Sequence, residues 1–202
     1  MRIALVAGLL LTACATYRGP ARDFEPDRLG RETGWLTAGQ VPLVRQQGER
    51  DCGAAALSMV LGFWRRPLDG AALTAARVPG PRGGAPAGRL RDLARSRGLA
   101  AYLVPARLRD LRYELRRGRP VLVGMVKRYG DEVVAHYEVV VAYHAAHGLV
   151  VTLDPAAGWR QYTVKGFLEE WRPARQLAIV VLGPRVIPDR LERPVVVRQA
   201  TR

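Results

Sequence analysis

Helical spacing of apolar residues is the clearest pattern in the middle of this chain. Leu57, Val60 and Leu61 recur at intervals of three and four, which predicts a helix over residues 51–64 with Asp51 as its N-cap. Similar amphipathic spacing, closed by glycines after two of the stretches, predicts further helices. These cover residues 68–77, 88–97, 108–117 and 166–171.

Short apolar runs rich in valine take over after residue 120. They predict strands, and shorter runs of the same kind occur earlier in the chain. The expected strands cover residues 41–44, 99–104, 120–126, 133–143, 149–153, 161–164 and 177–182. Helices first and antiparallel strands afterwards indicate an α+β fold, in one domain over residues 41–183.

The first residues have the pattern of an export signal. Arg2 is followed by an apolar run that is too short to span a bilayer comfortably. The run ends in Leu11-Thr12-Ala13-Cys14, which resembles the lipobox of bacterial lipoproteins. We therefore expect a signal peptide over residues 1–13 and a lipidated Cys14. An ordinary signal peptide with an incidental cysteine is the alternative.

A lipid anchor would place the protein in the bacterial cell envelope. Each buried methylene contributes about 0.8 kcal/mol, so two acyl chains hold a protein stably on a membrane. Ala15 is not the Asp associated with inner-membrane retention, which favours the outer membrane facing the periplasm. Residues 14–40 are rich in Arg, Gly and Pro without a period and predict a tether. Residues 184–202 predict a loosely held basic tail.

The formal net charge of +14 raises the question of nucleic-acid binding. The only lysines are Lys127 and Lys165, and all other positively charged side chains are arginines. The arginines are scattered along the chain without interleaved aromatic residues. We therefore expect no nucleic-acid partner. A solvated basic surface explains the charge and would favour anionic membrane surfaces or acidic peptides.

Cys52 is the candidate nucleophile. A polar loop ends in Asp51-Cys52-Gly53, and an Ala-rich helical run follows at once. The free N–H groups at a helix start favour the thiolate, and lipidation of Cys14 would leave Cys52 without a partner. A free thiol in an oxidising compartment is a liability unless it is used or shielded. The competing interpretation is a buried structural cysteine.

A cysteine nucleophile needs a base, and the chain has three histidines. His144 and His147 lie in a predicted turn and are expected to be solvated; as a pair they lack a third metal ligand, so no metal or other cofactor is expected. His136 lies near the start of a long apolar strand. A polar ring at that edge is placed to face a cleft, which makes His136 the candidate base.

The orienting group and the oxyanion donor come from two further positions. If the turn after the long strand is centred on Ala146, Asp154 falls opposite Glu138. His136 is then its diagonal neighbour, about 7–8 Å away at the backbone, whereas a one-residue slip would separate them. Gln46 lies shortly before Cys52, and its amide can form an oxyanion hole with the Cys52 N–H. Gln47 is the alternative donor.

These segments, in this order, resemble the C39 family of bacteriocin-processing, double-glycine cysteine peptidases. The resemblance covers residues 41–182, and the segments that carry it are Gln46–Leu61, Gly88–Leu99, Ala135–Val141, Leu153–Gly158 and Phe167–Trp171. It implies a papain-like domain in which Cys52 is the nucleophile, His136 the base, Asp154 the orienter and Gln46 the oxyanion donor. Its members cut peptides after small-residue pairs, typically Gly-Gly.

The leading hypothesis is a membrane-anchored cysteine peptidase that acts on peptides or proteins, with export machinery as a partner. No transmembrane or ATPase region is evident, unlike in the exporter-fused members, so a bacteriocin leader does not follow as the substrate. A docking module that binds exported substrates without turnover is the alternative. An acyl or amide transferase on the same scaffold is the third hypothesis.

Overall fold

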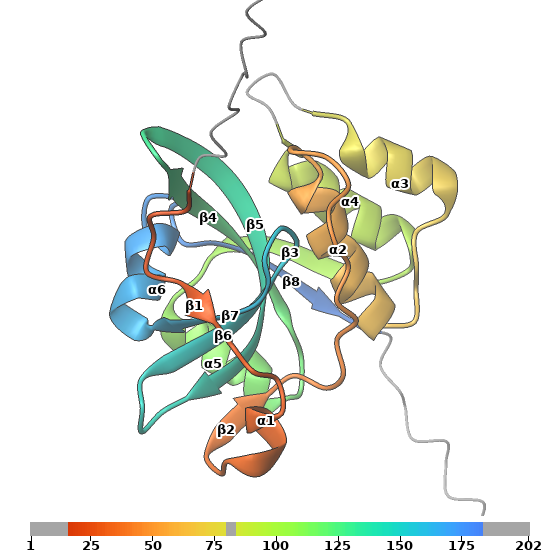
Figure 1. The fold of residues 1–202 in the computed structure, drawn as a ribbon. Helices are drawn as coiled ribbons and strands as arrows, with labels where there is room; N and C mark the ends of the chain where they lie inside the picture. The colour runs from red at the N-terminus through yellow and green to blue at the C-terminus, as the bar shows by residue number, and fades with distance from the viewer. Residues whose placement is uncertain (1–15, 80–83, 184–202) are drawn as a thin grey trace, which may run out of the picture.

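One antiparallel sheet of eight strands forms the centre of the fold, with helices on both faces (Figure 1). The computed structural model describes residues 16–79 and 84–183, so the expected signal peptide, Cys14 and the tail at residues 184–202 lie outside the described residues. The strands are β1 (Arg22–Asp23), β2 (Trp35–Thr37), β3 (Ala100–Pro105), β4 (Val121–Tyr129), β5 (Glu132–His144), β6 (Leu149–Asp154), β7 (Gly158–Thr163) and β8 (Leu177–Leu182).

The strand order is β1-β7-β6-β5-β4-β8-β3, and β2 pairs with β5 outside this path. The helices are α1 (Arg28–Arg31), α2 (Cys52–Phe63), α3 (Gly70–Arg77), α4 (Ala87–Ser96), α5 (Leu108–Arg116) and α6 (Val164–Trp171). In Figure 1, α2, α3 and α4 lie on one side of the sheet and α6 on the other. The expected α+β, papain-like class is therefore confirmed, with six of the seven expected strands and all five expected helices present.

Helix α2 is buried on almost every side, which explains why its sequence is apolar and Ala-rich. Residues 52–57 and 59–61 are buried, and the helix packs against β5, α3 and α4. A helix that is apolar on all sides must be covered by its neighbours. The small side chains of Ala54, Ala55 and Ala56 let those neighbours approach closely. The central position of α2 brings its N-terminus to the sheet.

The segment expected as a tether over residues 14–40 is instead part of the fold from residue 16 onward. Its chain forms β1, α1 and β2, and Phe24 is only 5% exposed, in edge-to-face contact with Trp35 at 5.6 Å between ring centroids. β1 adds to β7 and β2 adds to β5. The tether prediction was wrong because aromatic residues scattered without a period still find partners on a sheet edge.

The strand expected over residues 41–44 was also wrong. Those residues are not paired as a strand; Val41 and Val44 pack on the core from an irregular segment. Asp51 is the N-cap residue of α2, as predicted. Its side chain makes no cap hydrogen bond, and its carboxylate instead lies 3.4 Å from Arg77 Nε on α3.

Candidate active site

Cys52 is the first residue of α2, and the first turn of this helix packs directly against β5. The thiol residue is 3% exposed. A Cβ on Gly53 would lie 2.9 Å from Ala85 Cβ and 3.2 Å from the Tyr137 ring, which is closer than ordinary packing allows. Glycine after the cysteine is therefore required by close packing against β5 and the loop before α4.

His136 and Asp154 are brought together by pairing between β5 and β6. His136 Nε2 lies 2.8 Å from Asp154 Oδ1, and both side chains are buried. Since Nε2 faces the carboxylate, Nδ1 is the ring nitrogen left for the Cys52 thiol, and the interaction with His136 lowers the pKa of that thiol. The thiol, the imidazole and the carboxylate are thus coupled in that order.

A β-bulge makes this arrangement possible. His144 pairs with Leu149 across the turn, and that register alone would place Asp154 opposite Val139, on the wrong face of the sheet. The register shifts between Val140 and Ala142, so that Val139 pairs with Leu153 and Asp154 falls opposite Glu138. The predicted placement of Asp154 opposite Glu138 is therefore present. The turn is centred half a residue beyond Ala146, and the bulge cancels the resulting shift in register.

The turn after β6 holds the Asp154 carboxylate from the other side. Asp154 Oδ1 accepts hydrogen bonds from the backbone N–H groups of Ala156 at 2.7 Å and Ala157 at 3.3 Å. The Pro155 carbonyl accepts from the Gln46 N–H at 3.1 Å. The same turn therefore fixes Asp154 and ties the loop before Cys52 to the sheet.

The electrostatics of the three groups favour a thiolate–imidazolium pair. Burial alone would raise the pKa of Cys52, but the hydrogen bond and charge of His136, with backbone hydrogen bonds from Tyr137 and Gly53, lower it below the usual value. Burial lowers the pKa of His136, whereas its interactions with Asp154 and Cys52 raise it. The overall result is a pKa of about 9 for His136. Despite its burial, Asp154 has a pKa far below its usual range because of His136 and Lys127.

Gln46 lies at the cleft that leads to this group. A cavity of about 440 Å³ is lined by Gln46, Glu49, Arg50, Tyr129, Glu132, Val134, His136 and Ala156. The Gln46 amide donates one hydrogen bond to the Gly48 carbonyl at 3.1 Å, and its Oε1 is buried without a partner. Gln47, the alternative donor, instead accepts from Arg77 and does not line this cavity.

Of the other two histidines, His147 is an exposed turn residue as predicted, whereas His144 is not. His144 is 5% exposed, packs edge-to-face on Trp35, and has Nε2 2.9 Å from the Thr33 carbonyl. His147 donates its backbone N–H to His144 Nδ1. The N-terminal segment covers this turn, which is why His144 is structural.

Sequence reasoning missed two charged residues beside the triad-like group. Lys127 lies in β4 and Glu138 in β5, and the Lys127 ammonium is paired with both Glu138 and Asp154. Both side chains are fully or almost fully buried. The sequence signal that could have found them is a lysine in one apolar strand and a glutamate in the next. Such charges are expected to pair, because buried charges in proteins are usually paired.

The buried acidic groups do not form a vacant metal site. Ligand atoms of His136, Glu138 and Asp154 lie within 4.8 Å of one another. The Lys127 ammonium, however, already binds both carboxylates and takes the place that a cation would need.

Within residues 16–79 and 84–183, no helix is long and apolar enough to cross a membrane.

Comparison with known proteins places this geometry in a family. The model of the Peptidase C39 family matches residues 40–181. A C39-like peptidase from Bacillus anthracis, described as putative, is 17% identical with a TM-score of 0.61, covering 74% of this chain and 98% of its own. A double glycine motif protease from an AMS/PCAT transporter, solved with its leader peptide, is 18% identical with a TM-score of 0.58, covering 73% and 95%.

The peptidase domain of Streptococcus ComA, a bi-functional ABC transporter of a quorum sensing pathway, is 24% identical with a TM-score of 0.55, covering 72% of this chain and all of its own. Among curated proteins, none matches significantly. The structural likenesses share the fold, and the family model spans most of the described residues. The chain therefore belongs to the Peptidase C39 family.

Proposed function

We propose that this protein is a membrane-anchored cysteine peptidase in which Cys52 attacks the peptide bond. The observation that carries the proposal is the His136 ring, held by Asp154 at 2.8 Å and in contact with a buried thiol at the N-terminus of α2. Membership of a peptidase family supports the reaction class. The catalytic roles of the individual residues are the proposed part.

The reaction follows from the proton positions. The Cys52 thiolate attacks the scissile carbonyl carbon, and the carbonyl π electrons move to oxygen. The second N–H of the Gln46 amide and the Cys52 backbone N–H are the donors for that oxyanion. When the C–N bond breaks, the His136 imidazolium donates its proton to the leaving amine, leaving a thioester.

Water completes the cycle. Neutral His136 removes a proton from water, the resulting hydroxide adds to the thioester carbonyl, and the thiolate leaves as the C–S bond breaks. Asp154 accepts the hydrogen bond from the far ring nitrogen and stabilises the imidazolium in both half-reactions. The products are a peptide with a new carboxylate and one with a new amine.

The proposed substrate is a peptide or protein segment that binds in the cleft lined by Gln46 and His136. One structural neighbour is a double glycine motif protease in complex with a leader peptide, which supports a peptide ligand for this scaffold. Cleavage after a small-residue pair is the proposed rule.

A lipid on Cys14 would hold the cleft at a membrane surface, which we propose to be the periplasmic face of the outer membrane. The Thr16 carbonyl accepts from the Gly130 N–H at 3.0 Å, and Tyr17 bridges to Tyr129, which lines the cleft. Cys14 lies two positions before Thr16, with Ala15 between them, a reach of about 7 Å. Peptides presented at the bilayer are therefore the proposed substrates.

The test is cleavage of a peptide library that contains Gly-Gly, Gly-Ala and Ala-Ala pairs, with products identified by mass spectrometry. Wild type is expected to cut, and Cys52→Ala to lose all cleavage. Cys14→Ser is the matched control, because it removes the other thiol and leaves the site untouched. Equal hydrolysis by Cys52→Ala would refute the proposal, and peptide retention without hydrolysis by wild type would identify a docking module.

A further inference from the structure

Lys127 is a buried cation that the proposed reaction does not use. The residue is 2% exposed, and its ammonium nitrogen lies 2.5 Å from Asp154 Oδ2. It reaches Asp154 from β4, whereas His136 comes from β5 and Asp154 from the end of β6. Three neighbouring strands thus supply one buried cluster around a single carboxylate.

The two oxygens of Asp154 have separate partners. Oδ1 takes His136 Nε2 and the backbone N–H groups of Ala156 and Ala157, while Oδ2 takes Lys127. Turning the plane of the carboxylate away from this orientation would break these four contacts. Lys127 therefore helps to fix the plane in which one carboxylate oxygen faces the imidazole.

The ammonium is itself held in place by a second carboxylate. Glu138 pairs with Lys127 and accepts hydrogen bonds from Thr152 Oγ1 at 2.5 Å and from Tyr162 Oη at 2.8 Å. Tyr162 also reaches Glu170 on α6 at 3.3 Å. With its partners all buried, the Lys127 side chain has one geometry available.

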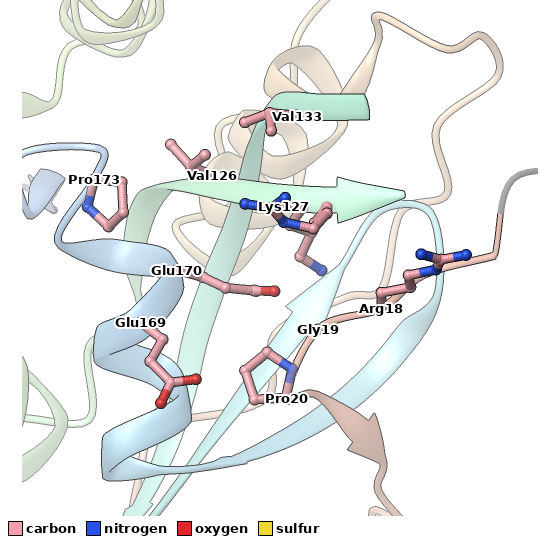
Figure 2. A pocket seen from close by; sticks show the side chains of 10 residues that line it. Arg18, Gly19, Pro20, Val126, Lys127, Val133, Glu169, Glu170 and Pro173 are labelled. Carbon is pink, nitrogen blue, oxygen red and sulfur yellow. The ribbon is translucent and has the colours of Figure 1, made fainter. Parts of the chain in front are cut away.

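Figure 2 shows the cavity of about 310 Å³ that adjoins Lys127, with Lys127 on β4 and Glu170 on α6 among its walls. The Tyr17 ring also lies near the ammonium, 5.0 Å from its nitrogen to the ring centroid. Shortening Lys127 would enlarge this cavity, so a test variant must keep the length of the side chain. The titratable or charged groups facing Lys127 are Tyr17, Tyr129, His136, Glu138, Asp154 and Glu170.

We propose that Lys127 is a positioning residue, whose ammonium holds the Asp154 carboxylate so that Oδ1 faces His136. The inference rests on the proposed cysteine peptidase function. Without Lys127, Oδ2 becomes a buried oxygen lacking a partner, and the carboxylate turns or takes up a proton. The Lys127 charge lowers the pKa of His136, but the hydrogen bond to Asp154 raises it by more. Loss of the oriented carboxylate therefore weakens the imidazolium of His136 and, through it, the Cys52 thiolate.

The test measures Cys52 reactivity without needing a substrate. The full chain is alkylated with iodoacetamide across pH 5–10, and the Cys52 peptide is quantified by mass spectrometry. Lys127→Met keeps the side-chain length and removes the charge. It is expected to slow alkylation at pH 7 about tenfold and to move the pH midpoint upward. In peptide cleavage, kcat is expected to fall with KM unchanged.

His144→Ala is the matched control, because it removes another buried polar side chain of β5 that contacts Thr33 and His147 rather than Lys127, Glu138 or Asp154. It is expected to stay within about twofold of wild type. Equal slowing by His144→Ala would overturn the inference, as would a wild-type rate and midpoint for folded Lys127→Met.

If Lys127→Met fails to fold, Lys127→Met with Glu138→Gln removes both opposite charges and still lacks the contact to Asp154. Slow alkylation in that double variant supports the inference, and wild-type alkylation overturns it. His136→Ala separates the two hypotheses. Slow alkylation in His136→Ala together with a normal rate in Lys127→Met would overturn only the role of Lys127. A normal rate in both would overturn the proposed function as well.

Discussion

Replacing His136 with alanine removes the ring between the Cys52 thiol and the Asp154 carboxylate. In wild type, contact with the His136 imidazolium outweighs burial and brings the pKa of Cys52 below the usual value of 9.0. In His136→Ala the burial remains and the counter-charge is gone. The pKa of Cys52 is therefore expected to rise to 9.0 or above, because burial disfavours the thiolate.

The size of the effect follows from the thiolate fraction. A thiol of pKa 9.0 is about 1% thiolate at pH 7, and each pKa unit by which His136 lowers the pKa of Cys52 raises that fraction about tenfold. The intrinsic nucleophilicity of the thiolate falls by about threefold over the same unit. The net expectation for His136→Ala is alkylation of Cys52 at pH 7 that is slower by about threefold for each unit that its pKa rises.

The assay uses Cys14→Ser as the parent, so that Cys52 is the single thiol, and follows iodoacetamide labelling by intact mass from pH 5 to 10. The wild-type rate should level off at a lower pH than the His136→Ala rate, which should still climb steeply through pH 9. His144→Ala is the matched control, because that ring lies away from the thiol on Trp35. Identical pH profiles for wild type and His136→Ala would refute the ion-pair reasoning.

Three further outcomes are expected. Peptide cleavage should fall as pH rises through about 9, because the imidazolium of His136 that protonates the leaving amine is lost there; a pH–kcat profile that stays flat to pH 10.5 would contradict this. Phe24→Ala should lower the free energy of unfolding by about 3–5 kcal/mol in urea titrations followed by tryptophan fluorescence, since it empties a buried aromatic site. The exposed Val133→Ala should change it by less than about 0.5 kcal/mol, and equal effects would argue for a tether. Cys14→Ser should move the protein from the membrane to the soluble fraction after cell lysis, and unchanged fractionation would refute lipidation.

Much of the fold could be predicted because its signals are local. The apolar run after Cys52 and the valine-rich run after His136 differ in period, and that difference separates α2 from β5. Asp154-Pro155 ends a strand because proline lacks the N–H that a ladder needs. The α+β class and the candidate residues Cys52, His136 and Asp154 follow from such patterns.

The register of β5 and β6 could not be predicted in the same way. A bulge near Val141 and a turn half a residue from its expected centre cancel one another, and the apolar sequence is compatible with either register. The register is selected by buried charged groups on the face of the sheet that β4, β5 and β6 share. Lys127 from β4 can pair with both Glu138 and Asp154 only when the two carboxylates lie opposite each other.

By itself the sequence determined which elements form and which side chains are chemically able to act, because propensity and periodicity depend on near neighbours. Tertiary structure alone decided that residues 16–40 cover the sheet, that His144 is buried, and that Lys127 supports Asp154. Each of these contacts joins residues far apart in the chain. The burial of apolar surface supplies their energy, and pairing offsets the cost of removing the charged groups from water, neither of which a local pattern records.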